Sequence, residues 1–322
     1  MAVADTLRER FGSQFKEHEP LSKHVNLRIG GPADFFVEAK SSQDIIDAVT
    51  LAKASSTPFF ILGGGSNTLV ADDGFRGLVI KAANRTMRID GTKVFAEAGV
   101  IAASVARASA EAGLTGFEWA ISLPGTIGGG VRGNAGCFGG EMRDSIESVR
   151  VLRNGVVETL TNADLNFGYR HSTLKDLGNS DVILDVILSL KQGDRTEALA
   201  NIDKNLTGRK ASQPLGASSA GCMFKNFEWT DDAAIEHLQS LVEVPPNFLA
   251  THRIPAGWII DKLNLKGTSI NDAEVSPQHG NFLLNKGHAT AIDIATLVDL
   301  VKKNVEEKSG IHLEEEVMRL GF

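Results

Sequence analysis

The spacing of apolar residues predicts helices alternating with strands along the first part of the chain. Residues 1–17 carry apolar positions at the helical period, and an extended run after the turn Gly30-Gly-Pro predicts a strand. Ser41, placed before Asp44, resembles the start of a capping box, and an apolar helical face follows it as far as Ser55. A short apolar strand over 59–62 then completes a β-α-β unit.

The same patterns predict elements along the rest of the chain. The dipeptides Asp90-Gly91 and Asn154-Gly155 are typical of turns between antiparallel strands, and Gly113 and Gly310 are placed to end helices. A boundary near 205–215 precedes a C-terminal region of mixed elements. We expect strands over 78–81, 94–97, 181–190, 280–284 and 311–320, a hairpin over 147–159, and helices over 101–112, 196–206, 231–242, 256–263 and 289–307.

A run of glycines, Gly63-Gly-Gly-Ser-Asn67, follows the strand over 59–62. Glycine has no Cβ, so consecutive backbone N–H groups can converge on a phosphate, and Ser and Asn side chains can add hydrogen bonds. The alternative is a tight turn, for which two residues would suffice. A P-loop would need a Gly-Lys-Ser/Thr sequence, and 63–68 contains no lysine. The pattern therefore favours an anion-binding loop that is not a P-loop.

A second glycine-rich stretch spans 122–140 and is too apolar for a solvated linker. It is also too rich in glycine for a regular element, so we expect an irregular second wall of the ligand site. Gly128 to Gly133 match the pattern G-x-G-x-x-G, but a Pro-Gly loop precedes them and more glycines follow. Because the dinucleotide-binding fingerprint requires a preceding strand and a following helix, we reject a Rossmann unit here.

Composition and charge narrow the class of protein. With 322 residues and 34.4 kDa, the chain exceeds the usual size of one core, so we expect two or three subdomains. The net charge of −7 disfavours a nonspecific nucleic-acid surface, and no apolar segment is long enough to span a bilayer. The first residues lack the apolar core of a secretory signal, and the two cysteines are far apart in sequence. We therefore expect a cytoplasmic protein with separate thiols and no membrane partner.

Three polar clusters are candidates for chemistry. Gly168-Tyr-Arg-His-Ser172 sets an arginine beside an aromatic ring, as in a carboxylate or phosphate clamp; the alternative is a surface salt bridge. The segment 218–226 combines small residues with Cys222, for which the alternative is a small core side chain. Glu314-Glu-Glu316 is a solvated charge run unless strand alternation turns one glutamate inward. The eight histidines are dispersed, so we expect no metal site.

Together these segments resemble the UDP-N-acetylenolpyruvoylglucosamine reductases, the flavoenzymes that complete UDP-N-acetylmuramate for bacterial cell-wall synthesis. The resemblance covers nearly the whole chain, and its motifs occur in the family's order. The first three motifs alone would also fit other flavoproteins of the vanillyl-alcohol-oxidase type. The motifs are Arg28-Ile-Gly-Gly-Pro-Ala-Asp, Gly63-Gly-Gly-Ser-Asn-Thr-Leu, Leu123-Pro-Gly-Thr-Ile-Gly-Gly, Asn134-Ala-Gly, Tyr169-Arg-His-Ser, Gly221-Cys-Met-Phe-Lys-Asn, Ala256-Gly-Trp-Ile-Ile-Asp and Leu313-Glu-Glu-Glu-Val.

The resemblance implies an α+β chain. It would have a two-subdomain FAD-binding fold of the vanillyl-alcohol-oxidase (PCMH) type and a C-terminal α/β substrate-binding domain. We expect the FAD-binding subdomains over 1–85 and 86–208, with the FAD-binding region itself over 28–193. The UDP-sugar domain is expected over 209–312, and 313–322 is expected to form a strand that carries a catalytic glutamate.

The resemblance also implies the cofactors and the residues that hold them. NADPH would reduce a tightly bound FAD and leave, after which hydride would pass to the enolpyruvyl group of a UDP-sugar. Gly63, Gly64, Gly65, Ser66 and Asn67 are expected at the FAD pyrophosphate. A second set is expected along the flavin and its diphosphate: Ser122, Pro124, Gly125, Thr126, Gly128, Asn134 and Gly136.

Three catalytic residues are carried over from the family motifs. Arg170 and Glu316 would polarise the enolpyruvyl group as negative charge develops on it, an effect that is strongest in a dry, preorganised site. Cys222 stands where the family usually has the serine that protonates the carbanionic carbon. Thiols are mostly protonated at neutral pH, so the donor role is retained. The expected substrate contacts are Tyr169, Lys225 and Asn226.

Some positions depart from the family pattern. Phe138 occupies a position that is often tyrosine, and Phe227 stands where proline is usual. Tyr169 is the only tyrosine of the chain, so the tyrosine-bearing loop of one subclass is absent, and the chain resembles the loop-lacking type II subclass. We expect a UDP-sugar partner, no nucleic acid, and a monomer in preference to an oligomer. The alternatives are another FAD-dependent oxidase or dehydrogenase on the same scaffold and a non-catalytic UDP-sugar-binding protein.

Overall fold

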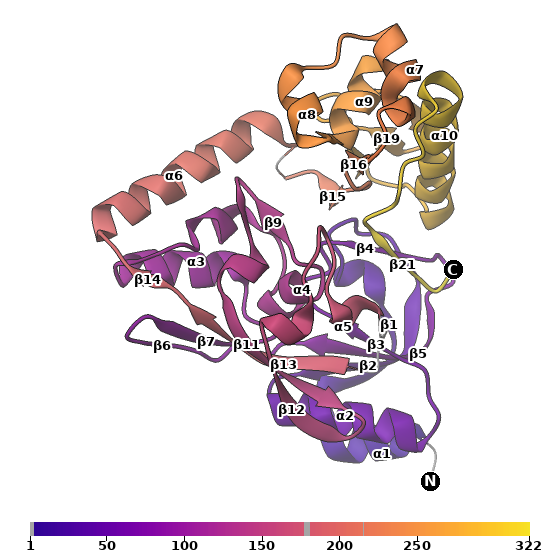
Figure 1. Ribbon diagram of the computed structural model, residues 1–322. Coiled ribbons are helices and arrows are strands. Elements are labelled where there is room, and N and C mark those ends of the chain that lie inside the picture. The colour runs from indigo at the N-terminus through magenta and orange to yellow at the C-terminus, as the bar shows by residue number, and fades with distance from the viewer. Residues whose placement is uncertain (1–2, 177–180, 215) are drawn as a thin grey trace. The chain divides into compact units, whose positions relative to one another are not determined.

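The computed structural model describes residues 3–176, 181–214 and 216–322, and the chain forms two compact units (Figure 1). Residues 1, 2 and 215, which the predicted helix over 1–17 and the predicted boundary include, lie outside the described residues. Each unit is assembled from segments that are distant in sequence. The first unit contains Met1–Glu19, Ala33–Gly65 and Phe75–Ala211, and the second contains Pro20–Pro32, Ser66–Gly74 and Ser212–Phe322.

A four-stranded sheet with the order β1-β2-β5-β3 organises the start of the first unit. Strands β2 and β3 both run parallel to β5, which lies between them in the sheet. The predicted β-α-β unit is therefore confirmed, but its two strands are separated by β5, a strand from later in the chain. Leu7, Ile45 and Ile80 belong to the core that joins the two helices to this sheet. The elements are α1 (Val3–Phe11), β1 (Phe15–Pro20), β2 (Pro32–Ala39), α2 (Ser42–Ala54), β3 (Phe59–Leu62) and β5 (Phe75–Ala82).

The predicted helix over 1–17 is wrong beyond Phe11. Gly12 adopts a left-handed backbone conformation with φ of +51°, which interrupts the helix, and a 3-10 turn then leads into β1. In β1 the ring of Phe15 lies 6.2 Å from the ring of Phe35, so its apolar contact is with β2. Tertiary packing therefore overrides the helical period of the sequence here.

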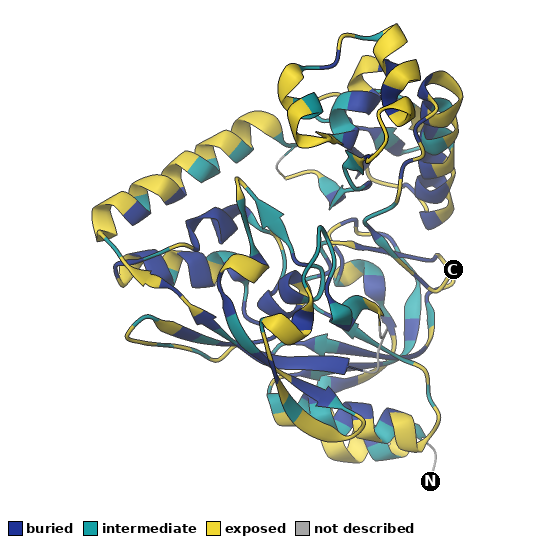
Figure 2. Cartoon of the chain, in the orientation of Figure 1, coloured by how far each residue is buried: buried dark blue, intermediate teal, exposed yellow. Residues whose placement is uncertain are grey.

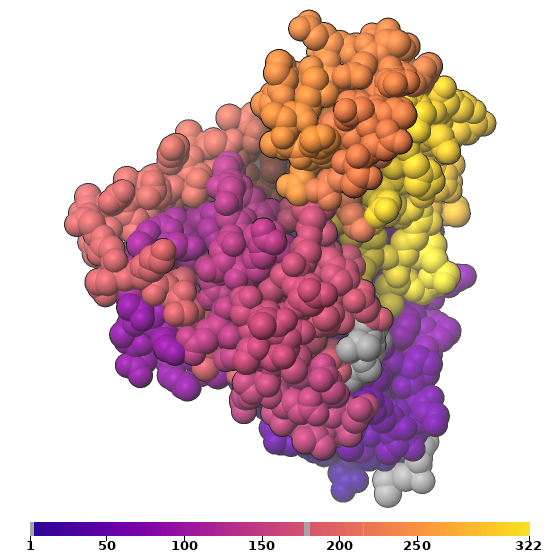
Figure 3. All heavy atoms as spheres, viewed as in Figure 1, coloured from indigo at the N-terminus to yellow at the C-terminus, as the bar shows by residue number. Residues whose placement is uncertain are grey.

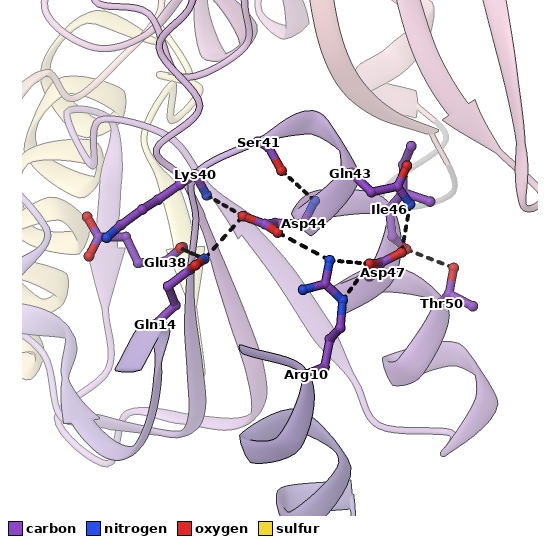
Figure 4. Close-up of polar contacts among 10 residues, drawn as sticks. All are labelled: Arg10, Gln14, Glu38, Lys40, Ser41, Gln43, Asp44, Ile46, Asp47 and Thr50. Carbon is purple, nitrogen blue, oxygen red and sulfur yellow. Dashed lines mark hydrogen bonds and ion pairs between the residues drawn. The ribbon is translucent and has the colours of Figure 1, made fainter. Parts of the chain in front are cut away.

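The start of α2 is held by polar contacts that Figure 4 shows. The Ser41 hydroxyl accepts a hydrogen bond from the Asp44 backbone N–H at 3.1 Å, which confirms the predicted cap. The Asp44 carboxylate accepts from the backbone N–H of Lys40, at 3.0 Å, and from the Gln14 amide, at 3.1 Å. Arg10 of α1 pairs with both Asp44 and Asp47. The cap thus also fastens α1 to α2.

A five-stranded antiparallel sheet, β12-β11-β13-β7-β6, organises the rest of the first unit. Its central strand β13 is almost entirely buried (Figure 2). Asn154 and Gly155 both have positive φ, +50° and +84°, so the predicted hairpin turn is confirmed. The elements are β6 (Met87–Asp90), β7 (Lys93–Glu97), α3 (Ala102–Glu111), β8 (Leu114–Thr115), α4 (Ile127–Arg132), β9 (Gly136–Cys137), β10 (Gly140–Glu141), β11 (Ile146–Arg153), β12 (Val156–Thr161), α5 (Thr173–Asp176), β13 (Asp181–Ser189), β14 (Lys191–Gln192) and α6 (Arg195–Ser212).

The second unit surrounds its own core with a four-stranded sheet, β15-β20-β19-β18, and helices. Leu27, Ile29 and Leu69 come from the early segments of the chain and join this core. A parallel pair, β4 with β21, links the segment 66–74 to the C-terminus. The elements are β4 (Thr68–Val70), β15 (Ser218–Cys222), β16 (Phe227–Glu228), α7 (Ala233–Leu241), α8 (Pro246–Thr251), β17 (Arg253–Ile254), α9 (Ala256–Lys262), β18 (Ser269–Ile270), β19 (Ala273–Val275), β20 (Phe282–Asn285), α10 (Ala291–Ser309) and β21 (Met318–Leu320).

The C-terminal segment differs from the prediction. Helix α10 ends at Gly310, with φ of +72°, as expected. In the space-filling view α10 and the residues after it, in yellow, adjoin the orange residues of the same unit (Figure 3). The strand expected over 311–320 is limited to Met318–Leu320, because the preceding residues bond to the backbone of 223–225 at isolated points. Among the described residues, no helix is both long and apolar enough to cross a membrane.

Replacing the α2 cap tests how much it contributes to stability. We expect Ser41→Ala to lower the free energy of unfolding by about 1 kcal/mol, because the partly buried N–H of Asp44 at the helix start loses its acceptor. Thr50→Ala, in the same helix, is the matched control: its hydroxyl donates only to the Ile46 carbonyl, so its loss should be neutral or slightly stabilising. Urea denaturation followed by circular dichroism measures both, and equal effects would contradict the role of the cap.

Candidate active site

The glycine loop after β3 lies directly against the loop before α4 in the first unit. A Cβ on Gly63 would lie 2.7 Å from the Thr126 hydroxyl, and one on Gly64 would lie 2.6 Å from the Gly125 Cα. Gly65 has φ of +64°, which other residues rarely adopt. No side chain fits at Gly63 or Gly64, so the structure brings together the two loops expected to hold the cofactor.

The loop before α4 is fixed by main-chain bonds to the segment 98–102. The N–H of Gly128 donates to the Ala98 carbonyl at 2.9 Å, and the N–H of Ile127 donates to the Val100 carbonyl at 2.8 Å. The Thr126 hydroxyl caps α4 by accepting from the Gly129 N–H. Gly128 therefore serves close packing, since a Cβ there would lie 2.9 Å from the Ala98 Cβ.

The expectation that 122–140 is irregular is wrong for two parts of it. Helix α4 spans Ile127–Arg132, and β9 and β10 form a short hairpin. Gly130 sits in the helix because a Cβ would lie 2.4 Å from the Met142 side chain. The glycines here allow a helix and a hairpin to pack closely against their neighbours, whereas the glycine-rich sequence predicted a segment without regular secondary structure.

Ser122 lies beside the thiol of Cys137. Its hydroxyl is 3.7 Å from Cys137 Sγ, which also donates to the Trp119 carbonyl at 3.3 Å. Burial raises the pKa of the Cys137 thiol, so this cysteine stays protonated and structural. Gly136 precedes it, and a Cβ there would lie 2.6 Å from the Gly140 carbonyl oxygen.

Asn134 is fully buried and adopts a left-handed backbone conformation, with φ of +42°. Its amide donates to the Glu141 carboxylate at 2.8 Å and to the Gly168 carbonyl at 2.9 Å, and its oxygen accepts from the Arg143 N–H at 3.0 Å. The side chain thus uses both amide hydrogens and its oxygen within the protein. Sequence reasoning expects a cofactor contact at Asn134, and within the protein its side-chain bonds join two loops.

One of those loops is a tight turn that presents Tyr169 and Arg170. The backbones of Gly168 and His171 exchange two hydrogen bonds, of 3.1 and 3.2 Å, across it. Arg170 has φ of +53°, a conformation that costs a non-glycine residue about 1–3 kcal/mol. Its guanidinium donates to the Gly136 carbonyl at 2.9 Å and lies 5.2 Å from the centre of the Tyr169 ring. The half-buried arginine is therefore held next to the expected cofactor loop.

In the second unit, Cys222 ends β15 opposite Phe282 of β20. Gly221 has φ of +78°, and a Cβ on it would lie 3.8 Å from the Ser66 carbonyl oxygen. Cys222 is half-buried. The strand register breaks between Ser219 and Cys222, so the chain leaves the regular sheet at this thiol.

The three glutamates near the C-terminus have different surroundings. Glu314 pairs with Lys225 at 2.7 Å, and Glu315 pairs with Lys302 and Arg319. The backbone N–H of Glu316 donates to the Met223 carbonyl at 2.8 Å, and the Glu316 carbonyl accepts from the Asn67 amide at 3.1 Å. Glu315 and Glu316 are both half-buried, whereas Glu314 is exposed. The second unit therefore brings Asn67 and Glu316 together, and Glu316 bonds to the residue after Cys222.

The expected substrate residues also have partners within the second unit. The Lys225 ammonium pairs with Glu314, and the Asn226 oxygen accepts from the Ala256 N–H at 3.4 Å, at the start of α9. Sequence reasoning missed Asn281, a buried residue that bonds to the segment after Cys222. The only sign of Asn281 in the sequence is a polar residue at the start of the apolar run 280–284. That pattern suggests that the residue is buried, but it does not show which groups it bonds to.

The residues present fit the diphosphate of FAD. The loop 63–67 carries no carboxylate and offers backbone N–H groups, a hydroxyl and an amide as donors. Two of its glycines have no space for a side chain, because the loop before α4 packs directly against them.

Comparisons with known proteins agree with these features. The model for the C-terminal domain of UDP-N-acetylenolpyruvoylglucosamine reductase matches residues 213–320, and an FAD binding domain model matches 33–161. The UDP-N-acetylenolpyruvoylglucosamine reductases of Caldanaerobacter subterraneus and Geobacillus thermodenitrificans are each 36% identical over 306 residues. These matches cover 94% of this chain and 93% and 92% of theirs.

A solved structure gives the same result. The crystal structure of UDP-N-acetylenolpyruvylglucosamine reductase from Thermus caldophilus has a TM-score of 0.75 and 32% sequence identity. The similarity covers 94% of this chain and 98% of that chain. The expected α+β architecture, an FAD-binding domain followed by the C-terminal domain of this reductase, is confirmed.

Replacing Asn134 tests whether its side chain holds the turn at Arg170. We expect Asn134→Gly, which keeps the left-handed backbone at no cost, to lower the free energy of unfolding by about 2–3 kcal/mol, because three hydrogen bonds are lost. Asn166→Gly is the matched control, since Asn166 has φ of +41° and is exposed; its effect should stay within about 0.5 kcal/mol. Chemical denaturation measures both, and indistinguishable variants would show that the amide is dispensable.

Proposed function

The chain belongs to the UDP-N-acetylenolpyruvoylglucosamine reductase family, and from this membership we infer that it catalyses the reaction of that family. The protein is an FAD-dependent oxidoreductase acting on a CH–CH bond. It converts UDP-N-acetyl-3-O-(1-carboxyvinyl)glucosamine to UDP-N-acetylmuramate with NADPH, in the synthesis of peptidoglycan precursors. The observation that carries the assignment is that one chain contains both an FAD-binding domain and the C-terminal domain of this reductase.

FAD, when bound, supplies the redox chemistry, in which hydride from NADPH reaches the enolpyruvyl double bond. We propose that residues 63–67 hold its diphosphate. The close contacts of Gly63 with Thr126 and of Gly64 with Gly125 support a shared site for the two loops. The residues proposed to line the flavin and diphosphate are Ser122, Pro124, Gly125, Thr126, Gly128, Asn134 and Gly136, with Asn134 acting through its loop contacts.

Arg170 is proposed to bind the enolpyruvyl carboxylate. A guanidinium is permanently charged and offers several donors in one plane, which suits the two oxygens of a carboxylate. Arg170 is already held in place in the protein without substrate. It lies in the turn at 168–171, it donates to the Gly136 carbonyl, and the Asn134 amide bonds to the Gly168 carbonyl of the same turn. Such preorganisation stabilises the charge that develops when the neighbouring carbon receives hydride.

Cys222 is proposed to donate the proton that completes the reaction, and Glu316 to polarise the same substrate group. Glu316 donates its backbone N–H to the carbonyl of Met223, the neighbour of Cys222, which supports a joint role for the two residues. Glu314 pairs with Lys225, and Glu315 pairs with Lys302 and Arg319. Lys225, Asn226 and Tyr169 are proposed as substrate contacts, and Lys225 would have to exchange Glu314 for a substrate phosphate.

We also propose the division of labour along the chain. Residues 1–85 and 86–208 would form the FAD-binding subdomains, 209–312 the UDP-sugar domain, and 313–322 the segment that carries Glu316. The two larger sheets of the first unit, which share no strand, support the first division. A cytoplasmic location is proposed because both cysteines are free thiols, as is usual in a reducing compartment.

An anaerobic experiment with two half-reactions tests the proposed function. We expect the purified protein to be yellow, to bleach with NADPH, and to regain its colour when enolpyruvyl-UDP-N-acetylglucosamine is added without oxygen. A protein that bleaches but is not reoxidised by this substrate would be another flavin oxidase or dehydrogenase. A colourless protein that retains no FAD after gentle purification would contradict the assignment.

The same half-reactions test Cys222. We expect Cys222→Ala to slow the substrate-driven half-reaction by about 10²–10⁴-fold, because a general acid is lost, and to leave bleaching by NADPH unchanged. Cys222→Ser, which restores a hydroxyl donor, should retain substantial turnover. Stopped-flow absorbance measures both steps. If Cys222→Ala reoxidised as fast as the parent protein, Cys222 would have no part in the mechanism.

A further inference from the structure

Asn281 lies immediately before β20, at the point where β15 leaves the sheet. Cys222 is the last residue of β15 and faces Phe282, and the register is already broken between Ser219 and Cys222. Beyond Cys222 the backbone polar groups of Met223 and Phe224 continue inward, where Phe224 is buried. Such groups require partners because an unpaired buried amide is costly.

Asn281 provides those partners on one side. Its backbone carbonyl accepts from the Met223 N–H at 2.8 Å. Its side-chain oxygen accepts from the Phe224 N–H, and its side-chain nitrogen donates to the Phe224 carbonyl, both at 2.8 Å. The carboxamide thus imitates a peptide group and extends the sheet by one more pair. It is 2% exposed, so water does not compete for these bonds.

The C-terminal glutamates occupy the other side of the same segment. The Met223 carbonyl accepts from the Glu316 N–H at 2.8 Å, and the Lys225 N–H donates to the Glu314 carbonyl at 2.9 Å. Met223 is also covalently joined to Cys222. The peptide units of Met223 and Phe224 are therefore bonded to Asn281 on one side and to the Glu314–Glu316 segment on the other.

Asn281 is itself held rigidly. Its N–H donates to Nδ1 of His279 at 3.2 Å, and the His279 ring packs against Phe282 with ring centres 4.9 Å apart. Burial lowers the pKa of His279, which keeps the ring neutral and its Nδ1 able to accept. A Cβ on Gly280 would lie 2.7 Å from the Gly257 carbonyl, so the backbone here has little freedom to shift.

We propose that Asn281 is a positioning residue for catalysis, which sets the places of Cys222 and Glu316 through the backbone of Met223 and Phe224. The inference rests on the proposed roles of Cys222 and Glu316. Reacting groups must be aligned closely, and a displacement of about 1 Å can cost about 10²-fold in rate. Asn281 does not touch the reacting atoms in this account, because all of its polar groups are bonded within the protein.

Asn281→Ala and Asn285→Ala form a matched pair for the test. Asn285 ends β20 and makes three side-chain bonds, to the Leu27 carbonyl and to the N–H groups of Gly287 and Ala289, whereas Asn281 makes two, both to Phe224. Both variants lose a similar number of hydrogen bonds, but only Asn281 contacts the segment after Cys222. We expect Asn281→Ala to slow the substrate-driven half-reaction by about 10²-fold with unchanged reduction by NADPH. Asn285→Ala should leave both steps unchanged.

A second readout does not depend on turnover. The alkylation rate of Cys222 by iodoacetamide, measured in the holoenzyme by peptide mass spectrometry with Cys137 as internal reference, should rise in Asn281→Ala and not in Asn285→Ala. If both variants matched in alkylation and in both half-reactions, the inference would be overturned. If Asn281→Ala failed to fold, Asn281→Asp would replace it, because it keeps the acceptor for the Phe224 N–H and loses the donor to the Phe224 carbonyl.

The experiments distinguish an error in the proposed role of Cys222 from an error in the proposed role of Asn281. Should Cys222→Ala keep a normal substrate-driven half-reaction, the role of Cys222 is wrong, and the alkylation rate still reports whether Asn281 places the segment. Should Cys222→Ala lose that step while Asn281→Ala keeps it at the parent rate, only the positioning role is refuted.

Discussion

The expected catalytic residues of both units depend on one physical constraint: main-chain polar groups that leave regular structure inside the protein must still be bonded. In each unit an almost fully buried asparagine meets this demand. Asn134 bonds the Gly168 carbonyl beneath the turn that carries Arg170, and Asn281 bonds both polar groups of Phe224 beside Cys222. A carboxamide suits these places because it is both donor and acceptor and carries no charge that would have to be desolvated.

Glycine has the complementary task around the expected cofactor loops. Gly63, Gly64, Gly128 and Gly130 each lie where a Cβ would collide with another part of the first unit. Glycine-rich segments are often regarded as flexible, yet here the missing side chains permit close contact between loops. Close contact fixes the backbone, and a fixed backbone can present its N–H groups to a phosphate without reorganisation.

Local signals in the sequence predicted much of the fold. The turn at Asn154-Gly155, the Ser41 cap and the glycine at the end of α10 each act within a few residues, so the sequence pattern suffices. The features that the sequence did not predict depend on contacts between residues that are far apart in the chain. Helix α4 forms in a glycine-rich segment because Ala98 and Met142 pack against its glycines, and residues 314–316 pair with 223–225 before the last strand begins. Motifs identified the loops of the candidate site, but Asn281 was missed because its partners lie 57 residues away.

The second unit is built from three separate segments of the chain, and this has a consequence for how the protein is made and inherited. Leu27, Ile29 and Leu69 share a core with residues from Ala220 to Val317, which are synthesised much later. During translation these apolar side chains therefore remain unburied by this core until the later residues have been synthesised. Recombination at a single point near Ser212 would separate β21 from β4 and the α10 N-terminus from Asp72. The three segments of the second unit can therefore be exchanged between relatives only together.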